Sequence, residues 1–414
     1  MEKEEKLKMI KKIGPVFYTV GIALLCFYVF CRGRDFLNLL TERETGYVLF
    51  PLFVLFLLTM SGFSKRYLVG KNRYTTYFAG IMSFLMLYLM LAVLCCDGIR
   101  FLLLGICGFE IDPGKMGLLL GFGGLTAVFI SLVYGIHHAG VIRVKRYPIR
   151  VENGGRAYRM VLLSDFHIGY YVGETHMRNV VRAVNRLHPD LVLIAGDLIN
   201  AGNTEECPAL EKVEEVLSEL QAKEGVLAVT GNHDPKRTDP AFREFLKKSG
   251  IRLLEDEAVE TDGGTIIGRN TRTEKRKPLS ELTEGVLKRP FIVLDHDPLG
   301  IKEAREEGMD YVLSGHTHKG QIFPLNLFLR ALYRKEEIWG FSKQGKTNLV
   351  VTAGSGYFSM PMRIGTDSEV VLLEQEEKAG KKITIGIDNP DRKGIIDKKR
   401  ETTGGNRSET MYGF

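Results

Sequence analysis

Aspartate, histidine and asparagine side chains, which bind metal ions in many proteins, recur in five polar turns of this sequence. Five of the nine histidines fall in these turns. Mixed sets of imidazole, carboxylate and amide ligands without thiolates suit divalent ions such as Mn²⁺, Fe²⁺ or Zn²⁺. The ligands are too many for one ion, and one carboxylate can bridge two, so we predict two metal ions about 3.5–4 Å apart. The turns are Ser164–His167, Gly196–Asp197, Gly231–Asp234, Asp295–Asp297 and Gly315–His318.

Each polar turn closely follows a short apolar run that predicts a buried β-strand. Uninterrupted runs of this kind suit strands that are covered on both faces. Ligand sites in α/β sheets form just beyond the carboxyl ends of the strands, so five strands would bring these side chains to one edge. The predicted strands are Arg159–Leu163, Leu191–Ala195, Val226–Thr230, Phe291–Leu294 and Tyr311–Leu313, with a sixth at Leu349–Thr352.

Helical patterns lie between several of these strands, at His176–Arg186, Leu210–Gln221 and Pro240–Lys248. The alternation of strand and helix predicts an α/β domain.

The ordered motifs SDFH, GD, GNHD, HDP and GHTHKGQ resemble those of the calcineurin-like metallophosphoesterase family. The resemblance covers about residues 141–374. More narrowly, GHTHKGQIFP and the later TAGSG and PMR segments resemble its membrane-associated bacterial branch, which includes phosphodiesterases and relatives that cleave UDP-diacylglucosamine. The resemblance implies two packed mixed β-sheets flanked by helices, an α+β or α/β fold. It also implies hydrolysis of a phosphate ester by a hydroxide that bridges two metal ions.

The resemblance further implies which residues bind the metals. One ion would be bound by three residues, one carboxylate would bridge both ions, and three residues would complete the second site. In that order the ligands are Asp165, His167 and His318, then Asp197, then Asn232, His296 and His316.

By the same resemblance, His233 would be the catalytic residue that donates a proton or a hydrogen bond to the leaving group. Many family members read GDxxD, and the second aspartate orients this histidine. Here Asn200 stands at that position. Its amide could still hold His233 but would stabilise a protonated imidazole less.

The first 136 residues contain four apolar runs without a charged residue, each about long enough to cross a hydrocarbon core of about 30 Å. Lys and Arg outnumber acids before the first run, between the second and third, and after the fourth. By the positive-inside rule this alternation predicts a multi-pass protein of the cell membrane with both termini, and hence the catalytic domain, in the cytoplasm. The predicted spans are residues 14–31, 47–63, 77–96 and 117–136.

Two further features of this region are a pair of closely spaced glycines and a short apolar stretch. Gly117 and Gly121 are four residues apart, a spacing that permits close helix packing or homodimerisation. The apolar stretch Ile99–Phe109 is too short to span a membrane and is expected to be a re-entrant or interfacial piece.

Several other residues have structural interpretations beside functional ones. We expect His176 and His188 to be solvated or packed, and His137 and His138 to supply polarity at the membrane interface. Arg363 would either contact substrate phosphate or form a structural ion pair.

Three segments of the chain have further predicted roles or structures. The apolar segment 321–333 would either contact acyl chains or headgroups, or form a buried helix. The polar segment 257–288 predicts a hairpin and a surface loop, and 375–414 predicts a polar, disordered tail apart from a short strand at 382–387.

Together these features predict a membrane-anchored, metal-dependent phosphoesterase that hydrolyses a phosphodiester or pyrophosphate bond of a lipid-linked or membrane-proximal substrate. The alternatives are a tethered phosphodiesterase or phosphomonoesterase acting on a soluble nucleotide, and an inactive metal-binding sensor or scaffold. The net charge of +6 is modest, and much of it flanks the apolar runs, so we do not expect a nucleic-acid partner.

Overall fold

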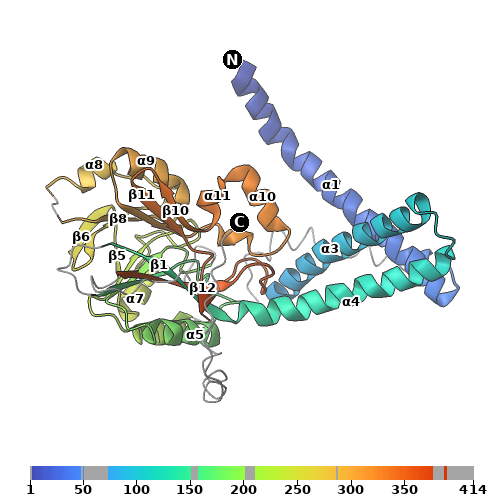
Figure 1. The fold of residues 1–414 in the computed structure, drawn as a ribbon, viewed down its shortest axis with the longest axis horizontal. Coiled ribbons are helices and arrows are strands. Elements are labelled where there is room, and N and C mark those ends of the chain that lie inside the picture. The colour runs from blue at the N-terminus through green and yellow to red at the C-terminus, as the bar shows by residue number, and fades with distance from the viewer. Residues whose placement is uncertain are drawn as a thin grey trace, which may run out of the picture. The chain divides into compact units, whose positions relative to one another are not determined.

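The computed structural model describes residues 2–47, 50, 73–150, 157–200, 210–285, 288–375 and 387–388 of the 414. The chain divides into two compact units (Figure 1). One comprises Met1–His138 and Phe358–Ile364, and the other comprises Ala139–Tyr357 and Gly365–Phe414. Each unit is described by itself.

The first unit is helical. Its elements are α1 (Glu2–Thr41), α3 (Arg73–Arg100), the π-helical turn η1 (Phe101–Ile106) and α4 (Pro113–Ala139). Within the described residues, Thr76–Ile106 and Pro113–Ala139 are long and apolar enough to cross a membrane. These helices contain the predicted spans 77–96 and 117–136. The predicted span 14–31 lies within α1, and most of 47–63 lies outside the described residues.

The stretch predicted as a separate re-entrant piece is largely a continuation of the third helix. Because no strong helix breaker interrupts the apolar run after Arg100, the helix continues through η1 to Ile106. It ends before Gly108, whose φ is +65°. The re-entrant alternative was therefore wrong over Ile99–Ile106, and the interfacial alternative stays a prediction.

The glycines of α4 pack against other helices of the same chain. A Cβ at Gly121 would lie 2.2 Å from Cδ2 of Phe36, and one at Gly117 would lie 3.0 Å from Cδ1 of Leu39. The spacing of these glycines therefore serves close packing of α4 on α1, as small residues at helix interfaces commonly do. Homodimerisation through them stays a prediction.

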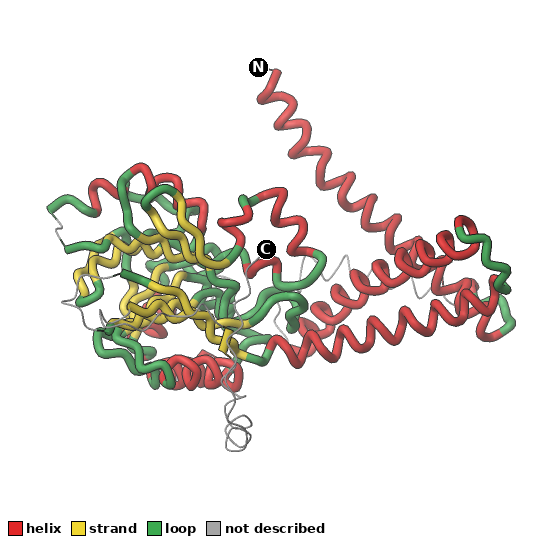
Figure 2. Tube along the Cα trace, viewed as in Figure 1, coloured by secondary structure: helices red, strands yellow, loops and turns green. Residues whose placement is uncertain are grey.

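The second unit contains two mixed sheets with helices around them (Figure 2). The first sheet has the order β13-β1-β12-β2-β3-β4-β5, and β2 to β5 run parallel. Its strands are β1 (Ile142–Pro148), β2 (Tyr158–Leu163), β3 (Leu191–Ala195), β4 (Val226–Val229), β5 (Ile251–Leu253), β12 (Ser368–Gln375) and β13 (Ile387–Asp388).

The second sheet has the order β10-β11-β9-β8-β7-β6, in which β11, β9, β8 and β7 run parallel. The two mixed sheets and their flanking helices confirm the predicted fold of this unit. The strands are β6 (Glu257–Thr261), β7 (Gly264–Gly268), β8 (Phe291–Leu294), β9 (Tyr311–Ser314), β10 (Gly340–Gln344) and β11 (Thr347–Val351).

Short and medium helices connect these strands. They are α5 (Glu174–Asn185), α6 (Leu210–Ser218), α7 (Pro240–Lys248), α8 (Leu279–Leu282), α9 (Ile301–Glu306), α10 (Leu325–Leu332) and α11 (Lys335–Ile338), with 3₁₀ turns η2 (Pro298–Gly300) and η3 (His318–Gly320).

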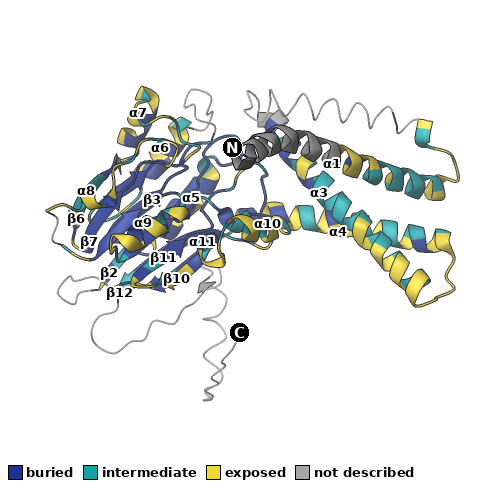
Figure 3. Cartoon of the chain, turned by 90° about the horizontal axis from the view of Figure 1, so that it is seen from above, coloured by how far each residue is buried: buried dark blue, intermediate teal, exposed yellow. Residues whose placement is uncertain are grey.

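One hydrophobic core cluster joins the two sheets. Alternate residues of one strand point to the same face, so Met160 and Leu162 of β2 and Leu193 of β3 meet Ile292 and Leu313 of the second sheet. The intervening residues of β2 and β3 are buried as well (Figure 3). Burial on both faces explains why these strands appear in the sequence as uninterrupted apolar runs.

Candidate dinuclear metal site

The predicted ligands lie in tight turns at the carboxyl ends of five strands. Five of these non-glycine residues have positive φ, which costs about 1–3 kcal/mol each and persists where the surroundings hold it. Backbone hydrogen bonds between turns supply that support, since the N–H of His167 donates to the carbonyl of Asp197 at 3.0 Å. The five are Asp165 (55°), His167 (48°), Asp197 (55°), His316 (74°) and His318 (49°).

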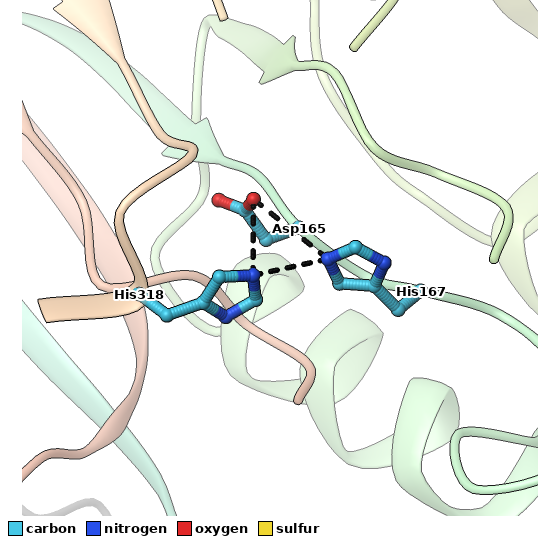
Figure 4. Close-up of side chains that lie close together, drawn as sticks. All are labelled: Asp165, His167 and His318. Carbon is cyan, nitrogen blue, oxygen red and sulfur yellow. Dashed lines mark hydrogen bonds and ion pairs between the residues drawn. The ribbon is translucent and has the colours of Figure 1, made fainter. Parts of the chain in front are cut away.

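One group of three ligand atoms comes from Asp165, His167 and His318 (Figure 4). The Nε2 atoms of the two histidines are 3.0 Å apart. Oδ1 of Asp165 lies 3.4 Å from Nε2 of His318 and 3.9 Å from Nε2 of His167. A divalent ion with ligand distances of about 2.0–2.2 Å keeps neighbouring ligands about 3.0–3.5 Å apart. Two of the three distances lie in this range and the third is slightly longer, so this buried group could hold a metal ion.

The second group comes from Asp197, His296 and His316. Nε2 of His296 lies 3.3 Å from Oδ2 of Asp197 and 3.1 Å from Nδ1 of His316. Asn232 joins the group, because its Oδ1 lies 3.1 Å from the same Nε2. All the predicted ligands of the second ion therefore meet around one point.

Oδ2 of Asp197 faces both groups. It lies 3.3 Å from Nε2 of His296 and 3.6 Å from Nε2 of His167. A carboxylate in this position can bridge two cations, which is the arrangement of two-metal sites. The seven predicted ligands therefore form two adjoining sets with one shared residue.

The carboxylates and imidazoles of the site strongly shift one another's pKa values. Burial, helped by the charge of Asp197, raises the pKa of Asp165 to about 6. Burial acts in the same direction on Asp197, but the charge of His296 outweighs it and holds the pKa of Asp197 well below its usual range. Although burial lowers it, the pKa of His296 rises to about 10 because of Asp197. The site therefore favours positive charge at its centre, as a cation-binding site must.

His233 lies at the edge of the two groups. Its backbone N–H donates to Oδ1 of Asp197 at 2.8 Å, and its ring centroid lies 5.2 Å from that of His167. The side chain is half-buried. Asn200 is anchored by its backbone, whose N–H donates to the carbonyl of Ile168 at 3.0 Å. The orienting role of Asn200 stays a prediction.

Sequence reasoning missed Asp234, the last residue of the GNHD turn. Its Oδ2 accepts hydrogen bonds from the N–H groups of Asp197 and Gly231, both at 2.8 Å, and its Oδ1 accepts from Ile199 at 2.9 Å. Burial and the charge of Asp197 raise the pKa of Asp234 to about 7. Its place in the motif was the available signal, but two of its three partners, Asp197 and Ile199, lie more than thirty residues earlier in the chain.

Two glycines let the turns approach one another. A Cβ at Gly231 would lie 2.1 Å from Oδ1 of Asp197, and a Cβ at Gly315 would lie 1.9 Å from Oγ of Ser164. Real Cβ atoms do not come so close, so only glycine fits at either position without a shift of the site.

The remaining histidines and Arg363 lie outside these groups. His176 is buried and its Nε2 lies 2.7 Å from the carbonyl of Ser355, whereas His188 is exposed. In the helical unit His138 stacks on Tyr134, with ring centroids 5.0 Å apart. Arg363 is fully buried in that unit, and its backbone N–H donates to the carbonyl of Gly135 at 3.0 Å. Whether its side chain contacts substrate phosphate or forms a structural ion pair stays a prediction.

Part of the predicted surface loop is instead buried beside the site. The hairpin β6–β7 forms as predicted. Arg269, however, is only 3% exposed, and Arg276 donates to Oδ2 of Asp295 at 2.6 Å. Asp295 directly precedes His296. These arginines are therefore structural cations that fix the loop, which composition alone could not indicate.

Comparison with known proteins agrees with this geometry. The profile of the calcineurin-like phosphoesterase family matches residues 158–320. An uncharacterized metallophosphoesterase of Aquifex aeolicus is 30% identical over 260 residues, which cover 59% of this chain and 97% of that protein.

Two other relatives are longer than the matched region. An uncharacterized metallophosphoesterase of Helicobacter pylori is 30% identical, with 56% of this chain and 63% of that protein covered. A Danio rerio "transmembrane protein with metallophosphoesterase domain" is 32% identical, with 61% of each chain covered. The match therefore spans about three fifths of each of these two relatives. The sequence match and the nearly complete coverage of the Aquifex protein place this chain in the calcineurin-like phosphoesterase family.

Proposed function

We propose that this chain is a metal-dependent phosphoesterase that hydrolyses a phosphodiester or pyrophosphate bond. The observation that carries the proposal is the pair of ligand groups that share Oδ2 of Asp197. Family membership supports the same reaction class. An inactive sensor is a weaker reading, because all seven ligands and His233 are present.

The proposed ligand sets follow the two groups. Two divalent ions bound there, of Mn, Fe or Zn, would lower the pKa of a water molecule and neutralise the charge on a phosphate group. Asp165, His167 and His318 would hold one, Asn232, His296 and His316 would hold the other, and Asp197 would touch both.

The chain's own residues then orient the substrate and move a proton. The two turns that carry Asp197 and His233 are tied together by the N–H of His233, so the imidazole is held close to the ligands. Its half-buried ring can reach a departing oxygen and give it a proton or a hydrogen bond, the role of a general acid. We therefore propose that His233 donates the proton or hydrogen bond to the leaving group.

The substrate we propose is lipid-linked or membrane-proximal. The same chain carries two helices that are long and apolar enough to cross a membrane. Helix α4 ends at Ala139 and β1 begins at Ile142, so a tether of two residues would hold the domain near the bilayer. Lys and Arg are concentrated in the flanks assigned to the cytoplasm, which supports a multi-pass protein with its catalytic domain on that side.

The experiment is an assay of the full chain in nanodiscs with Mn²⁺, using a soluble chromogenic phosphodiester and a phospholipid-type diester in the bilayer. We expect both to be hydrolysed, and Asp197→Ala to abolish both rates. Metal content is measured in parallel. Bound metal without turnover on diesters, pyrophosphates or nucleotides would favour the sensor, whereas activity on soluble nucleotides alone would favour the tethered enzyme.

A further inference from the structure

Helix α10 (Leu325–Leu332) carries an apolar stripe on its solvent side. Leu325, Phe328 and Leu332 follow the spacing i, i+3 and i+7 of one helix face. Their exposed fractions are 37%, 68% and 75%, and none of the eight residues of α10 is buried (Figure 3). The buried-helix interpretation of this segment is therefore wrong.

The side of α10 that faces the protein carries Asn326 and Leu329, its two half-buried residues. A Cβ at Gly320 would lie 2.4 Å from Cα of Asn326, so α10 packs on η3 at this point. The side-chain Oδ1 of Asn326 is enclosed. Ordinary surface helices turn most of their large apolar side chains to the core, whereas four of the five in α10 are exposed. An apolar face turned outward indicates a partner that is itself apolar.

Both ends of α10 adjoin proposed metal ligands. The helix begins seven residues after His318, which opens η3. Tyr333, which directly follows the helix, has its ring centroid 6.4 Å from that of His316. Whatever covers the apolar face of α10 therefore lies next to the site.

The charges around the stripe point to a bilayer with anionic lipids. Arg330, Arg334 and Lys335 are exposed, and Glu336 is the exposed acid among them. Three cations against one acid beside an apolar face are the features of a helix that lies in the headgroup region. A second copy of the same chain would bring these cations against one another, which disfavours it as the occupant.

We propose that α10 inserts its apolar face into the headgroup region of an anionic bilayer and so holds the metal site at the level of lipid phosphates. The inference rests on the proposed function, which it deepens by specifying how substrate reaches the site. It also requires the domain to lie near a membrane, as the candidate membrane helices suggest.

Insertion is tested directly with tryptophan fluorescence. The chain has one tryptophan, Trp339, which donates to Oε1 of Glu369 at 3.0 Å. The Phe328→Trp variant of the full chain is placed in nanodiscs of phosphatidylcholine with phosphatidylglycerol, and wild type supplies the Trp339 background. We expect the added emission to be blue-shifted and strongly quenched by lipids spin-labelled near the headgroup. A blue shift without lipid quenching would indicate a protein partner and overturn the proposal, as would emission typical of water.

A kinetic test follows the consequence for substrate access. In Phe328→Ser/Leu332→Ser we expect the rate on a soluble chromogenic diester to be unchanged, because both side chains are exposed and neither contributes to the core. The KM for a diester embedded in the bilayer should rise about tenfold or more. Leu299→Ser, which changes a 40% exposed leucine outside α10, is the matched control and should leave both values unchanged.

The two tests separate this inference from the proposed function. If the soluble diester is hydrolysed but the α10 variant behaves as wild type on both substrates, the role of α10 is refuted and the enzyme stands. If neither substrate is hydrolysed, the proposed function fails, and the fluorescence result alone decides whether α10 contacts lipid.

Discussion

Oδ2 of Asp234 accepts a hydrogen bond from the backbone N–H of Asp197 at 2.8 Å. The same oxygen accepts from Gly231, and Oδ1 accepts from Ile199. One carboxylate therefore fixes the turn of the proposed bridging ligand to the turn that carries Asn232 and His233. Such supporting contacts around metal ligands commonly decide how well the ligands are oriented.

We expect Asp234→Ala to weaken Mn²⁺ binding about 10–100-fold, because three backbone donors lose their acceptor and the two turns can separate. Isothermal titration of the full chain measures the affinity. Asp239→Ala is the matched control, since Asp239 caps α7 by accepting from Phe242 at 3.0 Å. It should cost about 1 kcal/mol of stability and leave metal affinity unchanged. A wild-type affinity for Mn²⁺ in Asp234→Ala would show that the hydrogen bonds of Asp234 to the two turns are not needed for metal binding.

Gly231→Ala should disrupt the packing between the turn of Asp197 and the turn that carries Asn232 and His233. The new methyl group would lie 2.1 Å from Oδ1 of Asp197, so the turns must move apart. Overpacking of this kind costs about 1–3 kcal/mol, and we expect a lower melting temperature together with weaker metal binding. In the control Gly169→Ala, the nearest atom would be Cβ of Asn200 at an ordinary 3.6 Å. Equal behaviour of the two variants would contradict the steric argument.

The ligand turns could be predicted because each is identified by residues that are neighbours in the sequence. A short apolar run followed at once by Asp165 or His316 identifies both the strand and the side chain at its end, and parallel strands bring such ends to one edge. The contacts that support the ligands are different. Asp234 binds the N–H of a residue 37 positions earlier, and only the folded sheet defines that pair.

Strand order and the orientation of α10 also could not be predicted from the sequence pattern. β12 lies between β1 and β2, parallel to one and antiparallel to the other, although it comes some two hundred residues later. The periodicity of 325–332 indicates an amphipathic helix, but it does not determine which face meets the protein. That choice depends on η3, whose Gly320 admits the backbone of Asn326.

Metal stoichiometry should distinguish the shared ligand from an unshared one. Because Oδ2 of Asp197 faces both ligand groups, we expect Asp197→Ala to lose both ions, whereas His318→Ala should lose the ion of its own group first. Metal analysis after dialysis against limiting Mn²⁺ measures the content per chain. Loss of the same number of ions in both variants would contradict the bridging assignment.

Metal binding should strengthen as pH rises, because protons compete with the ions. Burial lowers the pKa of His296, but Asp197 raises it to about 10, so this imidazole is protonated in the metal-free site at neutral pH. Each binding event at that group must release the proton, and one released proton gives about a tenfold gain in affinity per pH unit. The gain should become steeper below about pH 6, where Asp165 is protonated as well. Mn²⁺ titrations at several pH values test this. His296→Asn removes the competing imidazole and should flatten the dependence, whereas an equally steep slope in that variant would mean that another group releases the proton.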